Sequence, residues 1–355
     1  MHSLNYLINF QAFIIHTTIS KNSLKNIQNS ASLNSLSDIA APIQDDLKIF
    51  RDFFKEQTDT DIYLLDKIMR YLLRQKGKEI RPTLVFMSAR MFGEVDRRSY
   101  IAATMIELLH TATLIHDDVV DEADKRRGFL SINKLWRNKA GVLLGDFLLS
   151  KGLLIALDNE EYRMLQILSN AVKEMSEGEL RQLKTAKLFN MTEERYFQII
   201  SEKTASLISA CCECGASAAT DNPDVAAAMK QIGMNIGIAF QIKDDLFDYG
   251  LDDVGKPKRN DIQERKVTLP LIKALENASF TESLTIRRLM KKRKKSDKEV
   301  NRIVEFVHKK NGLENAKTSM NAFADKALQQ LQNLPVERGL EDFKNLVTFI
   351  TNRKK

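Results

Sequence analysis

The chain has 355 residues, of which 43% are hydrophobic, so it can bury a large core as one helical domain or as two ordinary domains. Its 54 Lys and Arg against 47 Asp and Glu give a net charge of +7, which suits anionic small substrates as well as nucleic acid. Cys211, Cys212 and Cys214 lie too close together for a secreted-type disulfide framework, which indicates a reducing compartment such as the cytoplasm. No run of about 18 uninterrupted apolar residues occurs, so a membrane span is not expected.

Residues 1–37 are predicted to form a poorly ordered N-terminal extension. The first 35 residues contain Ser, Asn and Lys with scattered apolar side chains but no Asp, Glu or Arg. The apolar stretch from Leu7 to Ile15 is short, is interrupted by polar residues and has no charged region before it, unlike a secretory signal. An organelle transit peptide without the usual arginines and a misassigned start site are the alternatives.

Residues 38–355 are predicted to form a single all-α domain. Apolar residues recur there at three- and four-residue spacing, and the few Gly and Pro lie between those stretches. Alternating strand patterns are missing, which argues against a doubly wound or sandwich fold. The predicted helices span residues 43–56, 61–75, 82–92, 97–121, 140–157, 161–185, 192–219, 223–250, 267–277, 281–293, 297–310, 313–332 and 339–352.

The segment 114–128, LIHDDVVDEADKRRG, places Asp117, Asp118 and Asp121 near the end of an apolar helix. Asp117 and Asp121 are one helical turn apart, so they share a face. Carboxylates this close repel each other unless a cation lies between them, and their oxygens suit Mg²⁺. The pattern therefore points to a magnesium site, although an acidic, solvated helix end is the simpler explanation for this motif alone.

A second acidic cluster changes that balance. Residues 240–248, FQIKDDLFD, place Asp244, Asp245 and Asp248 at nearly the same spacing. If the two helix ends face each other, the carboxylates can hold several Mg²⁺ ions around one diphosphate and neutralise the charge that grows as it leaves. The pair of clusters predicts a site that ionises a diphosphate ester.

Three places offer cations for a second diphosphate. Lys78 and Arg81 lie in a loop that leads into a helix, where Arg81 can bind a phosphate bidentately. Arg126 and Arg127 follow the first acidic cluster, and Lys203 stands beside the hydroxyl of Thr204 within a predicted helix. Each of these is more simply a surface cation when taken alone.

In order and spacing, these motifs resemble those of the trans-isoprenyl diphosphate synthase family, and of its long-chain members in particular. The similarity runs from about residue 40 to at least residue 275. It implies an all-α helical bundle of the isoprenoid synthase type with a central cavity, usually a homodimer. The implied reaction condenses an allylic diphosphate, such as farnesyl diphosphate, with successive isopentenyl diphosphate units. The motifs are GKEIRP, HDDVVDEADKRRG, the Lys203-Thr204 pair, FQIKDDLFD, GKP and KVTLP.

The resemblance also implies roles for individual residues. Two or three Mg²⁺ ions per active site would be held by Asp117, Asp121 and Asp244, with support from Asp118, Asp245 and Asp248. Isopentenyl diphosphate would be held by Lys78, Arg81, His110 and Arg127. The allylic diphosphate would be held by Arg126, Lys203, Thr204, Gln241 and Lys256. Arg259 and Arg265 stand where the family leads us to expect glycine, so the loop before Lys266 is predicted to be stiffer or differently shaped.

Product length is predicted to depend on side chains one or more turns before Asp117, because the growing tail must run into the bundle. Ala112 and Thr113 are small, whereas short-chain members of the family carry an aromatic residue there. Leu109 or Met105, deeper in the helix, would form the floor. These residues lie on the same predicted helix as Asp117. They predict a long product of about C30 to C45, of the kind used for quinone side chains.

Other functions fit the sequence less well. A metal phosphohydrolase built on the His116-Asp117 doublet needs further histidine ligands, but the chain has five histidines and two of them lie in the extension. A terpene cyclase would share the first acidic cluster but not the GKEIRP loop or the second cluster. A non-catalytic scaffold or an inactive partner subunit should have lost one of the clusters.

Two further features have simple structural interpretations. The three cysteines lack a second Cys or His pair at zinc-site spacing, so small buried helix residues are favoured. The basic run 287–295 could contact nucleic acid or anionic lipid, but a solvated loop is simpler because no aromatic residue interleaves with it. We therefore expect no nucleic-acid partner and at most weak contact with a membrane surface.

Overall fold

The computed structural model describes residues 35–74, 77–126, 129–188, 191–250, 260–336 and 338–353. The chain divides into two units at residue 41, Met1–Ala41 and Pro42–Lys355. The described part of the first unit holds helix α2 (Leu36–Ile39), which begins with a capping box between Ser35 and Asp38. The predicted poorly ordered extension, residues 1–37, falls mostly outside the described residues.

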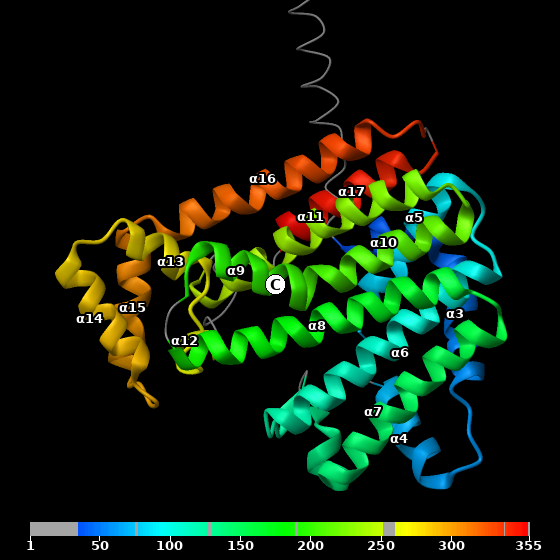
Figure 1. Ribbon diagram of the computed structural model, residues 1–355, viewed down its shortest axis with the longest axis horizontal. Helices are drawn as coiled ribbons and strands as arrows, with labels where there is room; N and C mark the ends of the chain where they lie inside the picture. Colours follow the sequence, from blue (N-terminus) through cyan, green and yellow to red (C-terminus); the bar gives the residue numbers. More distant parts are fainter. Residues whose placement is uncertain are drawn as a thin grey trace, which may run out of the picture. The chain divides into compact units, whose positions relative to one another are not determined.

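The second unit is built of α-helices, which confirms the predicted fold class (Figure 1). Most predicted helices agree with the observed ones within a few residues. The first half contains α3 (Gln44–Gln57), which follows a 3₁₀ turn (Ala41–Ile43), and then α4 (Tyr63–Arg74), α5 (Ile80–Phe92), α6 (Arg97–Val120), α7 (Ile132–Asp158) and α8 (Tyr162–Leu188). The second half contains α9 (Glu193–Ile200), α10 (Ser206–Ala219), α11 (Pro223–Asp248), α12 (Asn260–Gln263), α13 (Leu269–Glu276), α14 (Phe280–Lys291), α15 (Asp297–Lys309), α16 (Gly312–Gln332) and α17 (Leu340–Asn352).

Helix α6 packs against α5, α7, α8 and α10, and it carries the first acidic cluster at its C-terminal end. The side chain of Asp96 caps its N-terminus by accepting hydrogen bonds from the backbone N–H groups of Arg98 and Ser99. Buried, mostly apolar residues of α6 lie on several sides of the helix, as expected for a helix that packs against several neighbours. This packing fixes the position of the aspartates that follow.

Helix α11 carries the second acidic cluster and packs against α10, α16 and α17. A Cβ atom at Gly237 would lie 2.5 Å from the Cα of Ala205, and one at Gly233 would lie 2.7 Å from the Cα of Ser209. Small residues are therefore required for this close approach. Cys211, Cys212 and Cys214 are all free and buried on α10, which confirms the interpretation of the cysteines as small packed residues.

The structure departs from the prediction where local irregularities interrupt the periodic pattern. A π-helical segment (Ser201–Ala205) separates α9 from α10, which were predicted as one helix. Helix α7 begins at Ile132 rather than near residue 140 and bends at Arg137, whose φ is 71°. The first acidic cluster is followed by two short antiparallel strands, β1 (Lys125–Arg126) and β2 (Phe129–Leu130). Two-residue strands and a one-residue helical insertion leave too little pattern in the sequence to be predicted.

Candidate active site

The first acidic cluster lies at the C-terminal end of α6. Asp117 and Asp118 belong to its last turn, and Asp121 is its C-cap. The backbone N–H of Asp121 donates to the carbonyl oxygen of Asp117 at 2.8 Å, so the two residues are one helical turn apart, as predicted. Asp118 is buried, whereas Asp121 is exposed. Carboxylates at the negative end of a helix dipole are unfavourable, and a bound cation relieves this repulsion.

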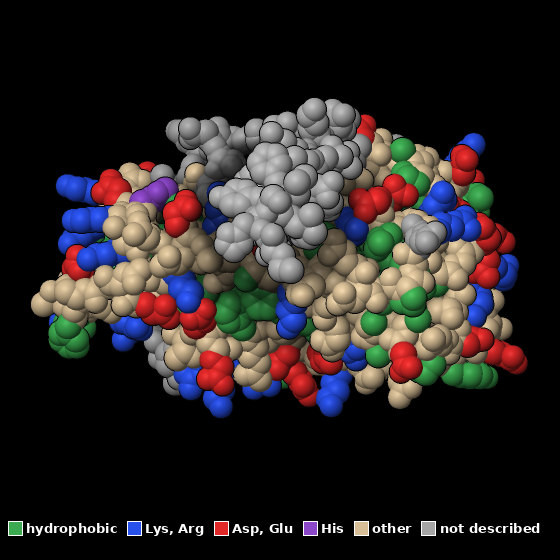
Figure 2. All heavy atoms as spheres, turned by 90° about the horizontal axis from the view of Figure 1, so that it is seen from above, with side chains coloured by type: hydrophobic (Ala, Val, Ile, Leu, Met, Phe, Trp, Pro, Cys, Tyr) green, Lys and Arg blue, Asp and Glu red, His purple; other side chains and the backbone are tan. Residues whose placement is uncertain are grey.

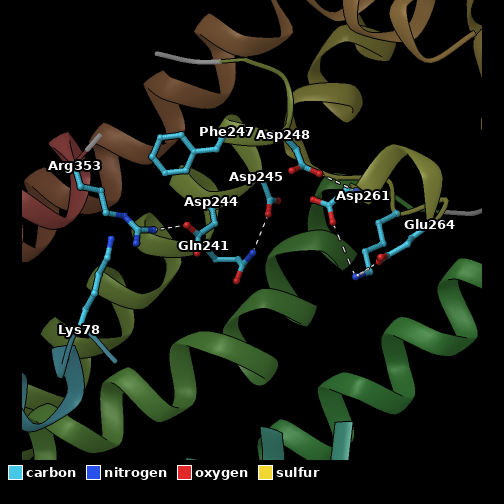
Figure 3. A pocket seen from close by; sticks show the side chains of 10 residues that line it. Lys78, Gln241, Asp244, Asp245, Phe247, Asp248, Asp261, Glu264 and Arg353 are labelled. Carbon is cyan, nitrogen blue, oxygen red and sulfur yellow. Dashed lines mark hydrogen bonds and ion pairs between the residues drawn. The ribbon is translucent and has the colours of Figure 1, made fainter. Parts of the chain in front are cut away.

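The second acidic cluster lies at the corresponding end of α11 and lines a cavity of about 440 Å³ (Figure 3). Asp244, Asp245 and Asp248 all contribute to its wall. The remaining lining residues come from several separate segments of the chain. They are Lys78, Gln241, Phe247, Asp261, Glu264, Lys266 and Arg353. Carboxylates and cations therefore face one space, an arrangement that suits a metal-bound diphosphate.

Asp245 is held by two hydrogen-bond donors deep in the protein. The hydroxyl of Tyr196 donates to it at 2.6 Å, and the side-chain amide of Gln241 donates at 2.8 Å. Burial, together with the nearby carboxylate of Asp261, raises the pKa of Asp245 to about 8, although the two hydrogen bonds partly oppose the rise. Tyr196 was not identified from the sequence, because a single tyrosine at the start of a helix gives no signal of this contact.

Asp261 extends the second acidic cluster and was also missed. Its backbone N–H donates to the carboxylate of Asp248 at 2.8 Å. Burial raises the pKa of the Asp261 carboxyl, and the nearby charge of Asp248 raises it further. Lys266 ion-pairs with Glu264 at 2.7 Å and approaches Asp261 at 4.0 Å. The acidic residues of the segment NDIQERK were a usable signal, but their distance in sequence from Asp248 concealed the contact.

Arg353 reaches the same cavity from just beyond the end of α17. Its guanidinium pairs with the carboxylate of Asp244 and stacks over the ring of Phe240, 4.0 Å from the ring centroid. Burial raises the pKa of Asp244, and the charge of Arg353 opposes this rise. The sequence gives no hint of the contact, because the two partners lie 109 positions apart. The charge of Asp244 is thus balanced within the protein by a cation from the other end of the unit.

The GKEIRP loop presents one of its two predicted cations to the cavity. Lys78 is exposed and lines the cavity, whereas Arg81 approaches Glu107 on α6 at 3.5 Å. Glu79 adopts a left-handed conformation with φ 51° and ion-pairs with Arg51 at 2.7 Å. The ion pair therefore fixes the side chain of Glu79 at a strained backbone position directly after Lys78.

Lys203 and Thr204 lie on the π-helical segment, a feature common at functional sites. The hydroxyl of Thr204 donates to the amide oxygen of Gln241 at 2.9 Å, which links it through Gln241 to Asp245. Lys203 ion-pairs with Glu179. Both residues line a second cavity of about 200 Å³ that shares Gln241 and Asp245 with the first. The structure therefore brings this pair to the second acidic cluster, and its role in binding the allylic diphosphate stays a prediction.

Lys266 connects the two acidic clusters electrostatically. Burial lowers the pKa of Lys266, but its hydrogen bond to Glu264 and the charges of Glu264, Asp261 and Asp121 outweigh this effect and raise it. Lys266 also lines both cavities. Asp121 of the first cluster therefore acts electrostatically on Lys266, which lines the cavity beside the second cluster. Arg265 precedes it with φ 64°, a conformation that favours glycine, at a position where the family resemblance led us to expect glycine.

The two histidines of α6 have different surroundings. His116 faces α7, where its Nε2 lies 3.3 Å from the carbonyl oxygen of Val142 and 3.5 Å from Asp146. Gly145 leaves the necessary room, because a Cβ there would lie 2.1 Å from the His116 ring. His116 is therefore a packing residue, which argues against a phosphohydrolase doublet. His110 is half-buried one and a half turns earlier.

The structure describes some predicted residues only in part. Arg127 and Lys256 lie outside the described residues, and for Arg126 only the backbone, in β1, is described. Leu109, Ala112 and Met105 are buried, at 5%, 2% and 2% exposure, and the hydroxyl of Thr113 donates to the carbonyl oxygen of His110 at 2.9 Å. Leu109, Ala112 and Met105 thus face the packed interior, Thr113 is half-buried, and the role of all four in chain length stays a prediction.

The donor chemistry of the site fits Mg²⁺. Five carboxylates line the larger cavity, and hard oxygen donors are what this ion prefers. Within the described residues, no three His, Cys, Asp or Glu side chains converge closely enough to hold an ion on their own. Magnesium in phosphate chemistry is usually bound by one or two carboxylates together with substrate phosphates and water. The arrangement therefore suits ions that arrive with a diphosphate.

Comparisons with known proteins give a consistent result. Residues 62–307 match the family model for polyprenyl synthetase. The chain is 34% identical to octaprenyl diphosphate synthase of Escherichia coli over 79% of its own length and 87% of that protein. It is similar to the structure of a decaprenyl diphosphate synthase from Rhodobacter capsulatus, with a TM-score of 0.85, 32% identity and coverage of 90% and 99% of the two chains. A polyprenyl synthase from Caulobacter crescentus, complexed with calcium and isoprenyl diphosphate, has a TM-score of 0.83 and 29% identity, with 91% and 99% coverage. The chain therefore belongs to the polyprenyl synthetase family and is a trans-prenyltransferase.

Proposed function

We propose that this long-chain prenyltransferase condenses an allylic diphosphate with successive isopentenyl diphosphate units to make an all-trans product of about C30 to C45. The observation that carries the proposal is the larger cavity, where the aspartates of α11 face Lys78 and Arg353 from distant segments. The carboxylates suit one diphosphate that is bound through metal ions, and the cations suit a second diphosphate that is bound directly by Lys and Arg side chains. Use of the product for quinone side chains is part of the proposal.

The carboxylates would hold the metal ions. Asp117 and Asp121 on one helix end and Asp244 on the other would bind two or three Mg²⁺, with Asp118, Asp245 and Asp248 fixing the shape of the site. The bound ions would neutralise the departing diphosphate. Arg353 must give up its contact with Asp244 when that carboxylate turns to a metal, so we expect it to move toward a substrate phosphate.

The cations and polar groups would hold the two substrates. Lys203, Thr204 and Gln241 would orient the allylic diphosphate, together with Arg126 and Lys256. Lys78, Arg81 and His110 would orient isopentenyl diphosphate, together with Arg127. The allylic carbon–oxygen bond breaks, the isopentenyl double bond attacks the cation, and the departing diphosphate accepts the released proton. The side chains act by position and charge, and no side-chain nucleophile is needed.

We also propose that two copies of the chain associate through α7. Among the described residues, α7 alone is long and apolar enough to cross a membrane by length and composition, and a third of the relevant window is buried. Its exposed face carries Leu143 at 69%, Leu154 at 52% and Leu157 at 46% exposure, all on one side of the helix. A second copy would cover this face in the reducing cytoplasm, where the free cysteines stay reduced. Leu143→Glu should convert a dimer to a monomer in light scattering, and a monomeric parent protein would refute the proposal.

The proposed reaction is tested by incubating purified protein with Mg²⁺, farnesyl diphosphate and labelled isopentenyl diphosphate, then sizing the products by chromatography. Labelled chains of about C30 to C45 are expected, and Asp244→Asn should lower the rate by at least about 100-fold. Products that stop after one addition would refute the predicted length. A protein that folds but forms no elongated product would refute the reaction.

A further inference from the structure

The outer face of α14 combines exposed apolar and cationic side chains. Phe280 is 83% exposed and Leu284 is 40% exposed, although both are large hydrophobic residues. Arg287, Arg288 and Lys291 are also exposed and follow at three- and four-residue spacing, so all five side chains share one face of the helix. The opposite face is the one that packs inward, with Ile286 and Met290 each 2% exposed.

Positive charge accumulates at the C-terminal end of this face. Residues 283–296 contain seven Lys and Arg and no Asp or Glu. Lys295 is buried and donates to the carbonyl oxygen of Lys292 at 3.0 Å, whereas the other six cations are exposed. Figure 2 shows Lys and Arg side chains gathered at the end of the molecule where Figure 1 places α14 and α15.

Two acidic residues on either side of the basic run have other contacts. Glu282 accepts hydrogen bonds from Ser279 at the start of α14 and ion-pairs with Lys310 at 2.8 Å. Glu299 caps the start of α15 through Ser296 and pairs with Lys292. Neither of these two carboxylates pairs with Arg287 or Arg288, which lie exposed on the same face of α14 as Phe280.

We propose that this face of α14 binds the surface of a bilayer that contains anionic phospholipids. The cations would lie at the phosphate groups, and Phe280 and Leu284 would enter the boundary between headgroups and acyl chains. The exposed apolar pair favours lipid over nucleic acid, because a phosphate backbone offers no apolar layer for aliphatic and aromatic side chains to enter. The inference does not depend on the proposed reaction, although a lipid product would benefit from release at a membrane.

The test is sedimentation of the full-length protein with vesicles. Vesicles of phosphatidylcholine alone are compared with vesicles in which about one third of the lipid is phosphatidylglycerol. The protein should sediment with the anionic vesicles and stay in the supernatant with the neutral ones. The triple variant R287Q/R288Q/K291Q should lower the partition coefficient about 100-fold, since each cation near an anionic surface contributes about fivefold.

A matched control variant distinguishes an effect of this face of α14 from a general effect of net charge. The variant K48Q/K317Q/K326Q removes the same charge from exposed positions on α3 and α16 and should bind vesicles like the parent. Phe280→Ser should weaken binding at high salt, where the charge contribution is screened. Equal sedimentation of the two triple variants, equal binding to neutral and anionic vesicles, or tighter binding to a DNA duplex than to vesicles would each overturn the proposal. Condensation activity on soluble substrates should be the same in all variants.

Discussion

Replacement of Tyr196 by Phe tests whether Asp245 helps to organise the metal site. The tyrosine is 3% exposed, and its hydroxyl donates to the buried carboxylate of Asp245 at 2.6 Å. Phe has nearly the same shape, so the substitution removes the hydroxyl and leaves the packing in place. A buried polar group that loses one of its hydrogen-bond partners costs about 1–3 kcal/mol. Gln241 would remain as a donor to Asp245, at 2.8 Å.

Loss of this contact should weaken the hold on Mg²⁺ rather than abolish folding. Residues that orient a metal ligand typically change metal affinity or activity by about 10- to 100-fold when mutated. We therefore expect the Mg²⁺ concentration at half-maximal rate to rise by about that factor, measured from initial rates with both substrates saturating. The unfolding free energy of the metal-free protein should fall by about 1–3 kcal/mol.

Tyr100→Phe is the matched control. Its hydroxyl donates to Asp46 at 3.1 Å, between α6 and α3 and away from both cavities. This variant should lose stability without any change in Mg²⁺ dependence. If Tyr196→Phe behaves in the same way, Tyr196 only stabilises the fold, and the proposed link between Asp245 and the metals is wrong.

Three further predictions concern other parts of the site. Ala112→Phe should shorten the product by at least about one five-carbon unit, measured by chromatography, because a ring at this buried position would obstruct the growing prenyl tail. A product of unchanged length would contradict this account of chain length. In metal-free buffer, Asp245 has a pKa of about 8 in the folded state and its ordinary value near 4 in the unfolded state. At pH values between the two, the folded state holds a proton that the unfolded state has lost, so the unfolding free energy should fall as pH rises through this window. Asp245→Asn should flatten this dependence in thermal melts, and a slope unchanged by the substitution would refute the assignment. Arg353→Met should destabilise the metal-free protein by about 1–3 kcal/mol, because Asp244 loses its partner. Arg353→Lys should be destabilised less, because it keeps the charge but not the stacking on Phe240. Equal melting temperatures for the parent and both variants would contradict this.

The helices and the two acidic clusters were predictable from the sequence because both depend on local spacing. Apolar periodicity located α6 and α11, and the helical repeat placed Asp117 one turn from Asp121. The Lys203-Thr204 pair was also found, since it is a contiguous motif. Its π-helical geometry was not, because the sequence around it keeps an ordinary helical pattern.

The contacts that shape the site could not be predicted, because they join segments far apart in the chain. Tyr196 and Asp245 are separated by 49 positions, and Arg353 and Asp244 by 109. No single-sequence pattern reports such pairs, and each residue alone resembles an ordinary helix residue. The contact of Asp261 with Asp248 joins residues 13 positions apart and was likewise hidden.

The most direct measurement is a crystal structure of the protein with Mn²⁺ in place of Mg²⁺ and with inorganic diphosphate. Anomalous scattering then locates each ion independently of the refined coordinates. The proposed function predicts peaks within about 2.0–2.3 Å of carboxylate oxygens from both helix ends, Asp117 or Asp121 on α6 and Asp244 on α11, with diphosphate between them. Ions bound to one helix end alone, or bound away from the diphosphate, would contradict it.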